Sequence, residues 1–443
     1  MKPDKRLYPV TDIQTFICNL LTHPNCTETY RKLYDIPLAL SIKPGVDFRR
    51  VNRAFHSLQL RHDVFRLTFV PTKKGWHARI SDTPRADIKI IDYGAEQAHN
   101  QTEHVASLLK QHVDITQDPL ISFDLLRYGD KGDVLLFRIH HLVSDGYGWI
   151  VAVENFLSLI LNIPIIGKPI SYPNYIKTFQ TLSSNQLKLG WDYWENLLFP
   201  AIPTPNLGRK AKGLDPYVPT FTDRNTSTYQ NELTADQSNQ ILNRAKDFGV
   251  TTYALLSGAF YGACHDISGA TELTFSTTLG RNEAMLDNFA GCHVQALILA
   301  CRKENGTSVK GQSRAIHQQV RESMKHLPHP ATIPLGPLQQ KVHENGGLLN
   351  QFMLSIARSE GRQNRSIFSK ALSPSAGKQS VGMYVIDNIR IPDNARTTRE
   401  LSIVQSRNAE NLSLTFNYDT EGFNPSEISD FASCYTKLLI HGD

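Results

Sequence analysis

Residues 133–149 read DVLLFRIHHLVSDGYGW and combine an apolar run, two adjacent histidines and a glycine-rich turn. The run 134–139 has the composition of a strand, and 147–161 has the apolar spacing of a helix. The pattern predicts a strand–loop–helix junction with His140 and His141 at the end of the strand. Adjacent strand residues point to opposite faces, so at most one of these histidines faces a given cavity.

Such a junction suits proton chemistry near neutral pH, because an imidazole can hold or pass a proton there. Gly146 can supply a positive φ for the turn. Backbone N–H groups at the start of the following helix can bind developing negative charge. Two other interpretations stay open from the residues alone: a histidine pair that only satisfies buried hydrogen bonds, and an HHxxxD metal site. The metal site is less favoured because adjacent histidines diverge and no HExxH-type pair occurs.

The bulk properties describe a globular chain of 443 residues, which suits two domains of roughly 200 residues each. A net charge of +5, spread without any Lys/Arg block, disfavours nucleic-acid binding. No apolar run reaches the ~18 residues that span a bilayer, and no signal peptide opens the chain. We therefore expect a cytoplasmic protein without membrane contact. The six cysteines form no CxxC pair, which indicates neither a zinc site nor a disulfide framework.

Both halves of the chain mix helices and strands, which predicts an α/β fold in two domains, 1–174 and 175–443. A Pro/Gly-rich stretch at 164–173 precedes the boundary. The remaining helices are expected at 48–61, 105–112, 175–197, 234–248, 252–265, 307–326 and 425–439. Further strands are expected at 64–70, 122–128, 273–278, 294–301, 351–357, 401–407 and 412–418.

The run HHLVSDG at 140–146 resembles the HHxxxDG signature of the condensation-domain superfamily of nonribosomal peptide synthetases. Other segments match that family in the same order along nearly the whole chain. They are YPVTDIQ at 8–14 (family PLSxAQ), RHDVFRLTF at 61–69 (RHExLRTxF), YW at 193–194, LGR at 279–281 (GR) and GCHVQ at 291–295 (GFFVN).

The resemblance implies a V-shaped pair of chloramphenicol-acetyltransferase-like α/β subdomains, with the active site in a tunnel between them. By position, His141 matches the catalytic histidine and His140 the structural one. Asp145 matches an aspartate that forms an ion pair with the arginine at Arg281, and Gly146 matches a glycine whose backbone approaches the reacting centre. Whether His141 acts as a general base or mainly positions the amine is left open by the sequence.

The segment Cys292–Gln295 departs from the family pattern, because two aromatic residues and an asparagine are missing. This departure predicts an unusual substrate. The candidate tunnel or substrate residues are Ser144, Tyr147, Trp149, His293, Gln295 and Ser355. Arg61, His62 and Arg66 are interpreted as fold-stabilising residues.

The resemblance implies a free-standing, monomeric acyltransferase that joins a carrier-bound acyl thioester to an amine, which is either a small molecule or an acceptor bound to a second carrier. Its donor would arrive on the 4′-phosphopantetheine arm of a separate carrier protein, and no permanently bound cofactor or metal is expected. The alternatives are an ester-forming O-acyltransferase, a coenzyme A-dependent acyltransferase and a catalytically idle recruitment domain. Cyclisation domains are disfavoured because they carry DxxxxD in place of the histidine pair. Epimerisation domains share Trp149 but have serine where this chain has Gly148.

Overall fold

The structure is a computed structural model, and its chain packs into two units. Unit 1 contains residues 1–180, 280–294 and 358–394, and unit 2 contains 181–279, 295–357 and 395–443. The structure describes residues 7–24, 26–27, 31, 33–109, 113–178, 184–202, 205, 207, 225–280, 284–302, 306, 308–326, 341–342, 344–345, 352–356, 378–389, 391, 401–408 and 411–442.

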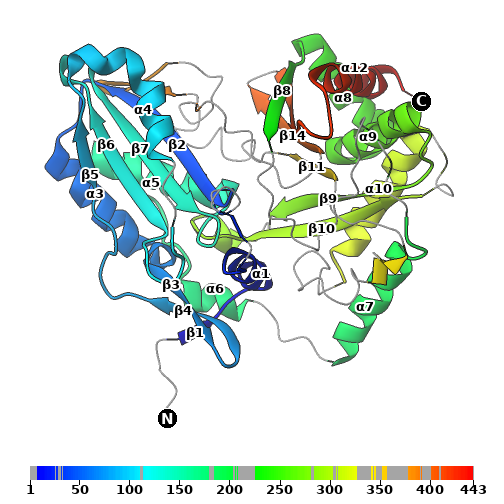
Figure 1. Ribbon diagram of the computed structural model, residues 1–443, viewed down its shortest axis with the longest axis horizontal. Helices are drawn as coiled ribbons and strands as arrows, with labels where there is room; N and C mark the ends of the chain where they lie inside the picture. Colours follow the sequence, from blue (N-terminus) through cyan, green and yellow to red (C-terminus); the bar gives the residue numbers. More distant parts are fainter. Residues whose placement is uncertain are drawn as a thin grey trace. The chain divides into compact units, whose positions relative to one another are not determined.

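A six-stranded sheet forms the centre of unit 1 (Figure 1). Strand β7 and its neighbour β2 lie in the middle, and only the β5–β6 pair is parallel. The strand order is β12 (Gln379–Val381), β13 (Tyr384–Asn388), β2 (Asp35–Lys43), β7 (Asp133–His140), β6 (Ile121–Arg127) and β5 (Lys89–Asp92).

Helices cover both faces of this sheet because β7 is apolar on both sides. On one face, Val134 and Leu136 pack in a core with Val105 of α4 (Gln101–Leu108). On the other face, Phe137 lies 4.8 Å from the ring of Phe156 in α5 (Gly146–Leu161), and α5 packs against α3 (Phe48–Arg61). Because β7 is packed on both faces, its last residue, His140, is held in a fixed position.

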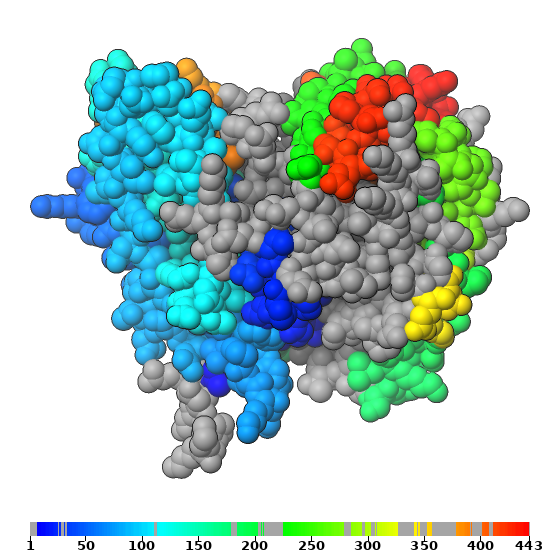
Figure 2. All heavy atoms as spheres, in the orientation of Figure 1, coloured from blue at the N-terminus to red at the C-terminus, as the bar shows by residue number. Residues whose placement is uncertain are grey.

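A small second sheet and two short helices complete unit 1. Strands β1 (Leu7–Pro9) and β3 (Leu67–Thr72) flank β4 (Gly75–Ile80), and α6 spans Tyr172–Lys177. Helix α1 (Asp12–Leu21) begins with a capping box, and Figure 2 shows its dark blue atoms at the surface.

Unit 2 contains the other six-stranded sheet, with its main core on one face. The strand order is β10 (Val294–Cys301), β9 (Leu273–Gly280), β11 (Phe352–Ile356), β14 (Leu401–Asn408), β15 (Asn411–Asp419) and β8 (Thr226–Glu232). The helices are α7 (Ser184–Leu198), α8 (Ala235–Phe248), α9 (Thr252–Ser268), α10 (Val309–Ser323) and α12 (Pro425–His441). Two α/β halves, each with its own sheet, confirm the predicted fold class.

Several elements differ from the sequence-based expectation, and three of these differences concern the sheet of unit 1 and the boundary between the units. Strand β2 was not anticipated, although it is the partner of β7. Strands β12 and β13 belong to unit 1, because β13 pairs with β2 despite lying more than 300 residues later in the chain. The expected helix at 175–197 is divided between α6 and α7. None of the helices within the described ranges is long and apolar enough to cross a membrane.

Candidate active site

The two histidines follow the alternation of β7. His140 falls on the face of Val134 and Leu136, toward α4, and His141 is the first residue after the strand. Tyr34 lies beside both rings: its ring centroid is 6.4 Å from each, stacked on His140 and edge-on to His141. The end of β7 thus gives the two imidazoles different surroundings, as the strand geometry predicts.

His140 supports the loop. Its ring is only 3% exposed, and Nδ1 accepts a hydrogen bond of 3.1 Å from the backbone N–H of Leu142. Its backbone N–H donates to the Leu120 carbonyl oxygen over 2.9 Å. These contacts fix the turn that follows β7, so the geometry agrees with a structural role for His140.

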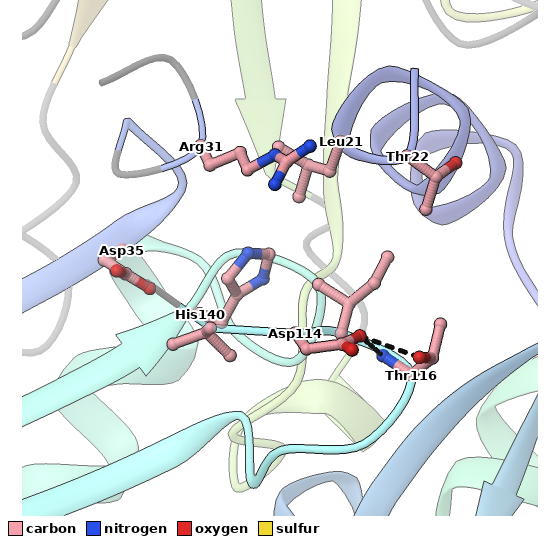
Figure 3. Close-up of a pocket in the computed structure, with 9 residues that line it drawn as sticks. Leu21, Thr22, Arg31, Asp35, Asp114, Thr116 and His140 are labelled. Atoms are coloured by element: carbon pink, nitrogen blue, oxygen red, sulfur yellow. Dashed lines mark hydrogen bonds between the residues drawn. The ribbon is translucent and has the colours of Figure 1, made fainter. Parts of the chain in front are cut away.

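A cavity of about 250 Å³ opens beside His140 (Figure 3). Three charged residues, Arg31, Asp35 and Asp114, contribute to its lining. The Asp114 carboxylate accepts hydrogen bonds from the backbone N–H and the hydroxyl of Thr116. Its other lining residues are Leu21, Thr22, Val113 and Ile115. The lining includes His140 but not His141, so this cavity is distinct from the immediate surroundings of the second histidine.

His141 is partly exposed, unlike its neighbour, and its backbone N–H donates to the Tyr34 carbonyl oxygen over 2.7 Å. Burial lowers the pKa of its imidazole below the ordinary value, while the negative charge of Asp145 and a hydrogen bond with the Ser144 backbone oppose that shift. A lowered pKa keeps the ring neutral near pH 7, which is the form that can accept a proton.

Asp145 connects the start of α5 to a distant segment. Its Oδ1 accepts hydrogen bonds from the backbone N–H groups of Tyr147 (3.0 Å) and Gly148 (2.8 Å), as the N-cap of the helix. Its Oδ2 accepts one from the backbone N–H of His293 over 2.9 Å. Asp145 is 5% exposed, so these bonds replace water around the carboxylate and fix the loop.

Gln14 of α1 holds the same loop through a side-chain hydrogen bond that no local sequence pattern predicts. Its buried amide nitrogen donates to the Leu142 carbonyl oxygen over 2.8 Å. Its amide oxygen accepts from the Thr11 backbone N–H and from the Tyr172 hydroxyl. Glutamine at position 14 was noted only as part of a motif, and its partner lies 128 residues away.

The segment 287–293 packs against the loop at several points. The Ser144 hydroxyl donates to the Ala290 carbonyl oxygen over 2.9 Å, and the Tyr175 hydroxyl donates to that of Cys292 over 2.9 Å. Tyr147 donates from its hydroxyl to the Asp287 carbonyl oxygen over 3.4 Å. Ser144 is fully buried, so this geometry makes it a support of the loop and not a surface open to substrate.

Gly148 is required by this packing. A Cβ at Gly148 would overlap the carbonyl oxygens of Ala290 and Gly291. A serine at this position, as in epimerisation domains, has no room beside that backbone.

Two expectations about the helix start are wrong. Gly146 does not adopt a positive φ: it is the first residue of α5, and the extended Asp145 makes the turn before it. The N–H groups of Tyr147, Gly148 and Trp149 are not available to a developing charge, because the side chain and carbonyl oxygen of Asp145 already accept from them. The cap of α5 therefore occupies three of the N–H groups that the sequence assigned to an oxyanion.

The other predicted site residues are dispersed. Arg281 lies outside the described residues, so its ion pair with Asp145 stays a prediction. Gln295 belongs to β10, but its side chain lies outside the description. Ser355 lies in β11 of unit 2 and is 7% exposed. Trp149 is partly exposed, and its indole N–H has no hydrogen-bond partner among the described residues.

The two arginines of the RHDVFR segment at 61–66 make hydrogen bonds that support the fold. Arg61 donates to Asn155 over 3.0 Å, and Arg66 donates to the Gln59 carbonyl oxygen over 2.9 Å. Within the described parts of the chain, no three His, Cys, Asp or Glu side chains are grouped to hold a metal ion.

Comparison with known proteins agrees with this geometry. The family model for the Condensation domain matches residues 4–441, so the chain belongs to the condensation-domain family. It is a condensation domain of the nonribosomal peptide synthetase type.

Its relatives include tyrocidine synthase 3 of Brevibacillus parabrevis, with 22% identity over 92% of this chain and 6% of that protein. They also include bacitracin synthase 1 of Bacillus licheniformis, with 22% identity over 98% of this chain and 8% of that protein. The chain thus spans less than a tenth of the length of these relatives.

Solved structures share the fold. The SgcC5 protein from Streptomyces globisporus has a TM-score of 0.71 and 16% identity, over 97% of both chains. The condensation domain of the monacolin K polyketide synthase MokA has a TM-score of 0.74 and 15% identity, over 98% of both chains.

Proposed function

We propose that this domain forms an amide bond between an acyl group, carried as a thioester on the phosphopantetheine arm of a separate carrier protein, and an amine. The observation that carries the proposal is His141: a partly exposed imidazole, kept neutral by burial, on a loop held by Asp145, Gln14 and the Tyr34 carbonyl.

In the proposed reaction, the amine nitrogen attacks the thioester carbonyl and a tetrahedral oxyanion forms. His141 accepts the proton that the nitrogen loses as the carbon–nitrogen bond forms. The oxyanion then collapses, the carbon–sulfur bond breaks, and the leaving thiolate of the carrier arm takes up the proton from His141, which returns the imidazole to its neutral form. His140 and Asp145 act by holding the loop. Gly146 remains a proposed point of close approach to substrate.

An alcohol acceptor is the second candidate, because the same steps with a hydroxyl yield an ester. The SgcC5 protein, which has this fold, was crystallised with a naphthyl ethanediol. That ligand belongs to SgcC5, and for this chain it justifies testing alcohols beside amines.

The test uses the purified chain with candidate acyl-carrier proteins, supplied separately, and a panel of amines and alcohols. Mass spectrometry of the released product distinguishes amide from ester, and an acyl-coenzyme A donor serves as a parallel arm. We expect amide product that depends on the acyl-carrier and falls by about 100-fold or more in His141→Ala. Undiminished product from that folded variant would remove His141 from the chemistry.

A further inference from the structure

His293 places a second imidazole against the loop of His141. Its ring is 3% exposed, and Nε2 lies 3.8 Å from Oδ1 of Asp145. Its backbone N–H already donates to Oδ2 of the same carboxylate. The ring of Tyr147 meets it edge-on, with the ring centroids 5.2 Å apart. His293 is therefore held next to the carboxylate that caps α5.

Asp145 acts on two parts of the site at once. Its Oδ1 holds the N–H groups of Tyr147 and Gly148, which begin the helix after the loop. Its negative charge also favours the protonated form of His141. That form is the one that His141 adopts when it accepts the proton of the amine. A change at Asp145 thus alters both the position of the loop and the basicity of His141.

Protonation of His293 would turn the imidazole beside that carboxylate into a cation. A separation of 3.8 Å is an ion-pair distance but exceeds the ~3.2 Å limit of a good N–H···O hydrogen bond. A charged ring attracts the carboxylate across this gap, and the pair is buried, so solvent screens the attraction only weakly. The attraction competes with the helix N–H groups for Oδ1 and offsets the field of Asp145 at His141.

The other titratable groups that the described residues place against His293 keep their state over the relevant pH range. Burial raises the pKa of the neighbouring Cys292 thiol, which therefore stays neutral. The Tyr147 hydroxyl donates to the Asp287 carbonyl oxygen, so it is protonated.

We propose that His293 is a proton-sensitive positioning residue. When neutral, its ring leaves Asp145 on the start of α5; when protonated, it draws the carboxylate toward itself and loosens the loop that carries His141. The consequence for turnover rests on the proposed function, whereas the consequence for the loop does not.

The first test measures turnover against pH in the wild-type chain and in His293→Gln, which keeps the backbone N–H and a side-chain donor but cannot become a cation. The acid limb of the wild type should fall by about two decades per pH unit, one each for His141 and His293, and that of the variant by about one. The exposed His99→Gln is the matched control and should follow the wild type. Equal slopes for wild type and His293→Gln would overturn the proposal.

The second test needs no substrate. Hydrogen exchange of the peptide covering 142–150, corrected for intrinsic rates, is compared at about pH 8 and about pH 5.5. The wild type should lose protection at the start of α5 in acid, and His293→Gln should not. Identical pH responses would overturn the proposal even if the amide-forming activity is established. Should His293→Gln fail to fold, His293→Phe, the residue type of the family pattern, takes its place in both tests.

Discussion

Two sheets of six strands carry very different chemistry in this chain. In unit 1, β7 is buried on both faces and delivers His140 and His141 into a loop held from several directions. In unit 2, β11 alternates: Phe352 and Leu354 enter the core, and Ser355 falls on the opposite face. The comparison shows that two sheets of similar architecture can differ in which polar and titratable side chains they hold at the ends of their strands. In unit 1, His140 and His141 lie where a doubly buried strand meets a capped helix, and the proposed chemistry is assigned to that junction.

The largest effect is expected when the negative charge of Asp145, which holds the loop of unit 1, is removed. Asp145→Asn keeps the size of the side chain but loses the carboxylate that accepts three backbone N–H bonds. Misplacing a catalytic group by about 1 Å can cost about 100-fold in rate, so we expect a loss of that order in turnover. Product formation under saturating substrate measures it. A loss below about threefold would show that the loop does not depend on this charge.

Packing of the loop against 287–293 can be tested with two glycines of the same helix. Gly148→Ser forces its Cβ against the Ala290 and Gly291 backbone, whereas a Cβ at Gly146 meets nothing within 4 Å. We expect Gly148→Ser to lower the free energy of unfolding by about 1–3 kcal/mol. Gly146→Ala should be neutral or stabilising by up to about 1 kcal/mol. Urea unfolding of both variants gives the comparison, and equal stabilities would contradict the close approach.

Because His62 is buried in unit 1, the free energy of unfolding is expected to depend on pH. Burial, with the charge of Arg61, lowers the pKa of His62 to about 3 from 6.5, and its ring nitrogens have no hydrogen-bond partner among the described residues. The folded chain therefore binds fewer protons than the unfolded chain between these values. His62 contributes stability that is present above pH 6.5 and lost as pH falls toward about 3.

Unfolding free energies measured from about pH 7 to about pH 5 should show this slope, which approaches about 1.4 kcal/mol per pH unit for one proton. His62→Phe should flatten it. A variant with the wild-type slope would mean that other groups cause the acid sensitivity.

The smallest effect is expected in unit 2. Ser355→Ala removes a hydroxyl from β11 in unit 2, and the strand alternation that packs Phe352 and Leu354 is unchanged. Turnover should stay within about threefold of wild type, with KM as the parameter to follow for a contact in substrate binding. A loss comparable to that of His141→Ala would place catalytic chemistry in unit 2 and break the contrast between the sheets.

Local patterns predicted most of the secondary structure because apolar spacing and turn residues act over short distances. The helices at 48–61, 234–248 and 425–439 and the strand before His140 lie close to their predicted bounds. Strand β2 was missed, and its Pro37 interrupts the usual composition of a central strand. The pairing of β13 with β2 could not be read locally, since nothing near 384–388 indicates a partner at 40–43.

The sequence by itself determined the family, the fold class and the position of His140 and His141 at a strand end, since these follow from a contiguous motif and from residue periodicity. Only the tertiary structure decided what holds that motif. It showed that Gln14 bonds to Leu142, that Asp145 accepts a hydrogen bond from the backbone N–H of His293, and that Gly148, not Gly146, is the glycine that packing requires. The physical reason is that hydrogen bonds and close contacts join residues over a hundred positions apart, and such partners leave no trace in local pattern.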